Sequence, residues 1–114
     1  MKLEFARGDS YDKGIIFKDK DSGRVISTEF DEVYFTVKKS AGEHDYLFQK
    51  KKSEGGIVYD GEGHYTLHID PEDTNQLMFG DYDCDIEVKN NDGYKKTFYG
   101  TLKLTKEVTH QYNE

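Results

Sequence analysis

The chain has 114 residues, enough for one domain with a single hydrophobic core and too few for a second domain. Its 23 acidic residues outnumber the 16 basic ones, and the net charge of −7 disfavours nucleic acid and anionic membranes as partners. No stretch is apolar enough to span a membrane, and the first residues lack the pattern of a signal peptide, so we expect a protein made in a reducing cytoplasm.

Short segments that alternate apolar and polar residues, separated by polar or glycine-rich turns, recur along the whole chain. A period of two residues is typical of half-buried β-strands. In chain order, the alternation predicts strands at Lys2–Phe5, Gly14–Lys18, Arg24–Thr28, Glu32–Lys39, Tyr46–Lys50, Gly55–Tyr59, His64–Ile69, Asp81–Lys89 and Tyr94–Lys106. Gly23 closes the turn at 19–23 with a positive φ, and the Asp-Gly pair ending at Gly93 predicts a tight hairpin.

One short helical turn interrupts the strands near residues 70–78. Asp70 is suited to cap it, Pro71 suits its first position, and the acids that follow favour its positive end. We expect the apolar residues 77–79 to plug the core as the turn ends. Gly100 stands inside the last strand, which predicts either a bulge or close packing against another backbone.

Together these elements predict an all-β fold, an antiparallel immunoglobulin-like β-sandwich of about 7–9 strands. Cys84, the single cysteine, falls on the apolar face of its strand and is expected to be a core residue rather than a nucleophile. The predicted core comprises Val33, Phe35, Val37, Tyr65, Leu67, Ile69, Cys84, Ile86, Val88, Phe98, Leu102 and Leu104. We expect one domain over residues 1–109 and a frayed tail over 110–114.

Several short motifs have a functional and a structural interpretation. The Arg-Gly-Asp sequence at 7–9 matches an integrin-binding tripeptide, and residues 19–23 partly match a calcium loop, but both fit ordinary turns better. The three lysines at 50–52 suit protection of an edge strand more than contact with an acidic partner. His64 and His68 share a strand face but lie about 13 Å apart, too far to hold one metal ion.

Three acids, Asp83, Asp85 and Glu87, share one face of their strand, with neighbours about 6.7 Å apart. This spacing would suit a pair of catalytic carboxylates, but such pairs need environments that separate their pKa values. The alternation places these side chains on a solvated face, so we predict that the chain is not an enzyme. Weak binding of divalent cations by these three carboxylates remains an alternative interpretation.

A set of motifs in a fixed order resembles a known group of proteins. They lie at 7–10, 35–38, 69–74, 79–88, 93, 97, 100–104 and 107–109. This order resembles small β-sandwich proteins of phages and prophages in Gram-positive bacteria. Its layout is similar to the N-terminal domain of phage baseplate upper proteins, whose matching motifs are structural. The resemblance carries over no catalytic residue, cofactor or metal.

The resemblance implies a non-enzymatic structural or assembly module of a tail, baseplate or head decoration. It implies contacts with other virion proteins and with copies of the chain itself, and assembly into a virion in the bacterial cytoplasm. The candidate interaction residues are Tyr34, Tyr46, Tyr94 and Tyr99 together with Asp83, Asp85 and Glu87. Because tyrosine rings also stack on sugars, a carbohydrate-binding β-sandwich is the alternative.

Overall fold

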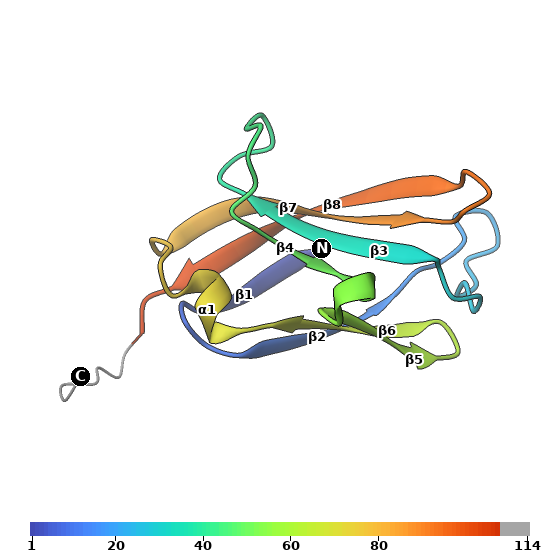
Figure 1. Ribbon diagram of the computed structural model, residues 1–114, viewed down its shortest axis with the longest axis horizontal. Coiled ribbons are helices and arrows are strands. Elements are labelled where there is room, and N and C mark those ends of the chain that lie inside the picture. Colours follow the sequence, from blue (N-terminus) through green and yellow to red (C-terminus); the bar gives the residue numbers. More distant parts are fainter. Residues whose placement is uncertain (108–114) are drawn as a thin grey trace.

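Apolar side chains on every second residue build eight strands, which the computed structural model describes within residues 1–107. In chain order the elements are β1 (Lys2–Ala6), β2 (Tyr11–Ile16), β3 (Glu32–Lys38), β4 (Phe48–Lys51), the 3-10 turn η1 (Lys52–Glu54), β5 (Ile57–Gly61), β6 (His64–Ile69), α1 (Pro71–Thr74), β7 (Gly80–Lys89) and β8 (Lys95–Thr105). One sheet has the order β1-β8-β7-β3-β4 and the other β2-β6-β5. The sheets form two layers (Figure 1), which confirms the predicted β-sandwich.

The core lies between the two sheets and contains the predicted inward residues. Strands β3 and β7 pair antiparallel in the centre of the larger sheet, so that Val33, Phe35 and Val37 lie beside Val88, Ile86 and Cys84. All of the predicted core residues are buried except Phe98, which is half-buried against the core. Seven further buried apolar or aromatic residues lie outside the predicted set, namely Leu3, Phe5, Phe17, Phe30, Phe48, Ile57 and Tyr82.

One strand pair departs from the expected antiparallel arrangement. β1 runs parallel to β8, with Lys2 opposite Thr101 and Ala6 opposite Thr105. Gly100 lies where this pair begins, and a Cβ there would stand only 2.5 Å from the carbonyl oxygen of Met1. The register of β7 and β8 is continuous through Gly100, so close packing, and not a bulge, explains this glycine.

The segment predicted as a strand at Arg24–Thr28 is not one, and the prediction was wrong. Only Val25 forms an isolated bridge, with Lys18, before the chain crosses to the larger sheet. The crossing buries Phe30, whose N–H donates to the hydroxyl of Tyr65 at 2.9 Å. Aromatic packing and side-chain hydrogen bonds therefore fix this segment in place of a strand ladder.

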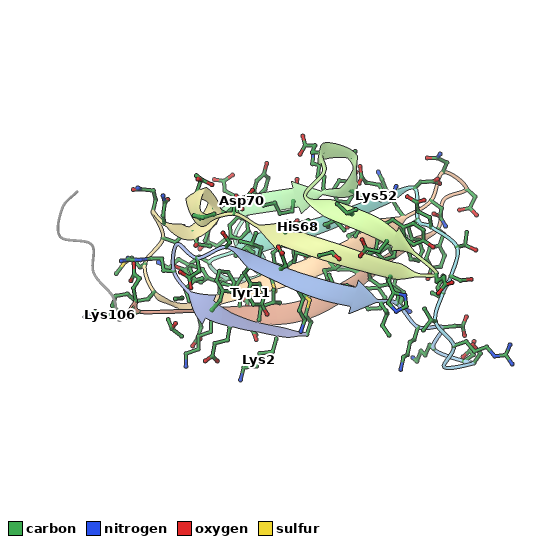
Figure 2. The ribbon with its side chains drawn as sticks, turned by 90° about the horizontal axis from the view of Figure 1, so that it is seen from below. Lys2, Tyr11, Lys52, His68, Asp70 and Lys106 are labelled. Atoms are coloured by element: carbon green, nitrogen blue, oxygen red, sulfur yellow. The ribbon has the colours of Figure 1, made fainter. Side chains whose placement is uncertain are left out.

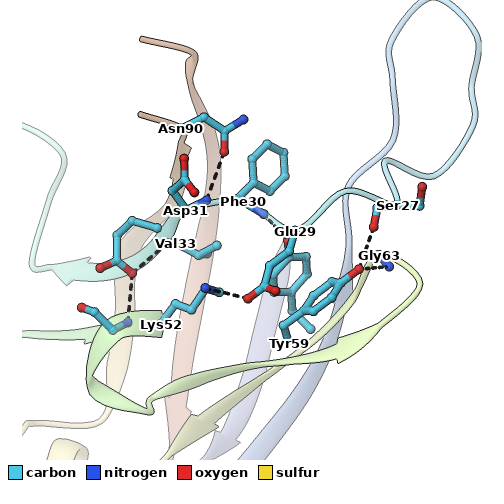
Figure 3. A network of polar contacts seen from close by, with 12 residues as sticks. Ser27, Glu29, Phe30, Asp31, Val33, Lys52, Tyr59, Gly63 and Asn90 are labelled. Atoms are coloured by element: carbon cyan, nitrogen blue, oxygen red, sulfur yellow. Dashed lines mark hydrogen bonds and ion pairs between the residues drawn. The ribbon is translucent and has the colours of Figure 1, made fainter. Parts of the chain in front are cut away.

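Polar contacts hold the same crossing between the layers (Figure 3). Lys52 pairs with Glu29 at 2.7 Å, and the hydroxyl of Tyr59 donates to the carbonyl of Ser27 at 2.6 Å. At the far end, the Asn90 side chain accepts from the N–H of Asp31 at 3.0 Å. Lys52, from the tract predicted to protect an edge, is thus engaged within the fold.

The helical turn is present but shorter than predicted, because α1 ends at Thr74. The Asp73 carboxylate accepts the N–H of Asp70 at 2.8 Å, while Lys50 pairs with Asp70 at 2.9 Å and with Asp73 at 2.6 Å. Lys50 therefore ties β4 of the larger sheet to the end of the smaller one.

The expected plug at 77–79 is largely wrong, since Leu77 is half-buried while Met78 and Phe79 are exposed. Three consecutive residues of an irregular segment cannot all face one core. The predicted domain end at 109 and the predicted tail at 110–114 lie outside the described residues.

Candidate binding surface

The outer face of the five-stranded sheet, which looks away from the core, carries most of the predicted interaction residues. Tyr34 on β3 and the three acids of β7 alternate with buried core residues, and the exposed Tyr99 on β8 stands between the half-buried Phe98 and Gly100. Register places Glu87 beside Tyr34 and Asp85 beside Tyr99. The structure thus brings these side chains onto one face, as the two-residue period predicted.

Two adjoining hollows mark the middle of this face. The first, of about 380 Å³, is lined by residues that include Asp83, Asp85 and Tyr99. The second, of about 340 Å³, is lined by residues that include Tyr34, Tyr46 and Glu87. Thr36, Lys38 and Asp85 border both hollows. Six of the seven predicted residues therefore surround one continuous polar depression, whose centre is Asp85.

The connection between β3 and β4, residues 39–47, forms one wall of the depression. The Asp83 carboxylate accepts the N–H of Ala41 at 2.7 Å, and Lys38 donates to the carbonyl of Glu43 at 3.0 Å. At the base of the connection, Leu47 donates its N–H to the carbonyl of Val37 at 2.7 Å. One acid and one lysine of the face thus hold the wall.

Asp85 differs from its neighbours because its half-buried carboxylate has neither a hydrogen bond nor an ion pair within residues 1–107. Asp83 accepts from Ala41, and Glu87 pairs with Lys95 at 3.6 Å. Burial raises the pKa of Asp85 above its ordinary value, and the charge of Glu87 raises it further, while Lys38 opposes both. A partly desolvated carboxylate of this kind favours a cationic or hydrogen-bond-donating ligand group.

Replacing this carboxylate, Asp85→Asn, should stabilise the fold at pH 7. The folded protein binds the Asp85 proton more tightly than the unfolded chain, so ionisation lowers stability as the pH rises through the raised pKa. Solvent screening keeps the gain on the order of 0.5 kcal/mol. Denaturant unfolding at pH 7 and at pH 3 checks it, because the gain should vanish where the carboxyl is protonated. A gain that persisted at pH 3 would contradict the electrostatic cause.

The tyrosines of the predicted surface have different environments. Tyr34 lies between two cations, with Lys51 Nζ at 5.8 Å and Lys89 Nζ at 5.5 Å from its ring centroid. Tyr99 is 75% exposed, so its ring presents a free apolar face. Tyr94 is not part of the depression, because it stacks on Phe30 with ring centroids 6.0 Å apart.

The sequence interpretation missed Lys38, His44 and Gln49, which also line the depression. The alternation in β3 places Lys38 on the outward side of its strand, so the sequence pattern already indicated that Lys38 lies on this face. His44 comes from the connecting loop, and no sequence period indicates where a loop residue lies.

The discounted motifs have structural partners. The guanidinium of Arg7 pairs with Glu107 at 3.3 Å and donates to the carbonyl of Leu77 at 3.2 Å. The Asp19 carboxylate accepts two backbone N–H groups of its own turn, which lower its pKa. These contacts within the fold favour a structural role for the Arg-Gly-Asp segment and for the turn at 19–23. His68 pairs with Asp12 at 2.7 Å.

Within residues 1–107, no three side chains of His, Cys, Asp or Glu converge as metal ligands do. Over the same residues, no helix has the length and apolar character needed to cross a membrane. Cys84 is buried, and burial raises its thiol pKa to about 12. A thiol that is neutral and enclosed at pH 7 is poorly suited to nucleophilic chemistry.

Comparison with known proteins bears on the fold and on the sequence resemblance. No protein-family model matches the sequence, and no curated protein does. The solved structure of CopC from Methylosinus trichosporium OB3b is similar, with a TM-score of 0.50 and 15% identity. The match covers 96% of this chain and 89% of that one, and at this identity it concerns the fold alone.

The resemblance to phage and prophage proteins is wrong, because the similar solved structure is CopC and not a phage protein. The function predicted from it, a virion structural module, is corrected with it, and the carbohydrate-binding alternative is set aside. The expected location in a virion stays an untested prediction. What the comparison shows is a CopC-like β-sandwich.

Proposed function

We propose that this chain is a non-enzymatic binding domain that docks a protein partner on the outer face of its five-stranded sheet. The observation that carries the proposal is the polar depression around Asp85, bordered by Tyr34, Tyr46 and Tyr99. Exposed tyrosines combine an apolar ring with a polar hydroxyl and are enriched in protein interfaces.

Charge indicates what the partner presents. The depression contains a half-buried carboxylate at Asp85, with Glu87 beside it, in a chain of net charge −7. Glu87 already pairs with Lys95 at 3.6 Å, so a basic side chain of the partner would pair with Asp85 and offset both its desolvation and its repulsion from Glu87. The long-range field of an acidic chain would also speed the encounter with a basic surface.

Affinity capture from the source cell with matched variants tests this proposal. The double variant Tyr99→Ser, Asp85→Lys alters the depression, whereas Lys20→Ser, Asp21→Lys alters an exposed turn elsewhere. We expect the wild type and the turn variant to retain the same protein, the depression variant to lose it, and retention to fall as salt rises. A partner that the depression variant retains as well as the wild type would refute the proposal, as would no partner at all.

A further inference from the structure

The two ends of β8 have different surroundings. β8 runs over Lys95–Thr105, but β1 pairs with it only from Thr101 onward. Within residues 1–107, no strand pairs with the first half of β8 on the side opposite β7. The larger sheet therefore has an open edge over residues 95–99, which adjoins the end of β1.

The backbone of this open edge is oriented for further pairing. Thr101 donates its N–H to the carbonyl of Met1 at 3.0 Å, and Thr105 accepts from the N–H of Arg7 at 3.0 Å. Odd-numbered residues of β8 thus turn their backbone polar groups toward the β1 side. Because the orientation alternates along a strand, Thr97 and Tyr99 present N–H and C=O groups at the open edge.

An apolar groove of about 520 Å³ runs beside this edge. Its lining includes Ile15, Ile16 and Phe17 from the edge of the smaller sheet, with Ile86 and Phe98 from the larger one. Ile16 is 42% exposed, and Phe98 is the one predicted core residue that is not fully buried. The groove exists because β1 is shorter than β8 and leaves the edges of both sheets uncovered beside residues 95–99.

All charged residues that line the groove are lysines, namely Lys2, Lys13 and Lys18. Figure 2 shows β2 beside β1 along this side of the molecule, with Lys2 pointing outward. Lys96 adds one more exposed cation on the open half of β8, whereas Lys95 pairs with Glu87 at 3.6 Å. A local excess of positive charge in a chain of net charge −7 favours an acidic occupant.

Lysines on an edge strand can also act only to discourage aggregation. That explanation accounts for the charges but not for an apolar groove beneath them, since an edge protected from pairing gains nothing from an exposed Ile16 beside a half-buried Phe98. The open backbone, the groove and the lysines together match what strand addition requires: backbone pairing for affinity, and sites for alternate side chains for selectivity.

We propose that the open edge of β8 binds an extended segment of another protein in which apolar and acidic residues alternate. The segment adds a strand to the larger sheet beside residues 95–99. Its apolar side chains enter the groove, and its acidic side chains face the lysines. This site adjoins the depression around Asp85, because Tyr99 lines both the depression and the groove. Its occupant pairs with the backbone of β8 and does not depend on the function proposed for the depression.

A blocked, fluorescent hexapeptide of alternating valine and glutamate tests the proposal by anisotropy titration. We expect saturable binding to the wild-type chain at low salt, at least tenfold weaker binding of the valine–lysine peptide, and loss of affinity when a central valine of the acidic peptide is replaced by proline. Absence of saturable binding, or equal binding of the acidic and basic peptides, would overturn the proposal.

Two variants of the protein locate the site. Thr97→Pro removes an N–H that points to the open edge, where proline is tolerated, and Ile16→Glu puts an acid at the groove. Each should weaken the acidic peptide at least tenfold. Val58→Glu is the matched control, because Val58 is 41% exposed on β5, at the other edge of the same small sheet as Ile16. Unfolding curves verify that all three variants fold, and equal weakening by Val58→Glu would refute the assignment.

Discussion

Replacing Phe35 by alanine is expected to lower the free energy of unfolding by about 4 kcal/mol, the range of a fully buried phenylalanine. Phe35 is 0% exposed on the central strand β3, and its ring lies 6.2 Å from that of Phe48 on the next strand. It also stands opposite Ile86 of β7, so its loss opens a cavity that neither neighbouring strand can close. Denaturant unfolding monitored by circular dichroism measures the change.

The adjacent residue provides the control for this substitution. Tyr34 lies on the outer face, so Tyr34→Ala should cost less than about 1 kcal/mol. If the two substitutions had equal effects, the assignment of alternate residues to core and surface in β3 would be wrong. The contrast matters for function as well, because it shows that the tyrosine of the depression can be changed without unfolding the chain.

Gly63→Ala is expected to destabilise the fold by about 3 kcal/mol through two separate causes. Gly63 has a φ of +82°, which L-residues with a Cβ rarely adopt. A Cβ there would stand 2.5 Å from the carbonyl oxygen of Ile26 and 2.7 Å from a methyl group of Val25. Ile26 donates its N–H to Phe17 at 2.8 Å, so this backbone cannot easily move away.

Gly23→Ala separates the two causes. Gly23 has a similar φ of +72°, but beyond its chain neighbours no atom lies within 4 Å of the position that a Cβ would take. Its substitution should therefore show the conformational cost alone, about 1 kcal/mol. Urea unfolding of both variants gives the difference. Equal losses at the two sites would mean that the Ile26 contact adjusts freely and contributes nothing.

Local periodicity was enough to predict much of the fold. The alternation in Glu32–Lys38 and Gly80–Lys89 identifies two central strands and the residues that each buries, because one buried face imposes a period of two. The parallel pairing of β1 with β8 could not be predicted in this way, since it joins segments almost a whole chain apart. The failed strand at Arg24–Thr28 shows the same limit, because packing of Phe30 and Tyr65 decides that segment.

The candidate surface was predictable to a similar degree. The period of β7 places Asp83, Asp85 and Glu87 on the outer face, but only the register with β3 and β8 brings Tyr34 and Tyr99 beside them. The depression itself depends on the loop at 39–47, whose path no period describes. The open edge of β8 was also hidden, although the consecutive apolar residues Ile15, Ile16 and Phe17 break the alternation and were its one local signal.

The parallel pairing of β1 with β8 has a mechanical consequence. Lys2 stands at one end of the paired segment and Thr105 at the other, with the two strands running in the same direction between them. Tension applied at these two residues would pull the strands past each other in shear. The force would then act on all of the backbone hydrogen bonds between β1 and β8 at the same time, instead of breaking these bonds one after another. A domain tethered through these two strands would therefore hold its fold under load.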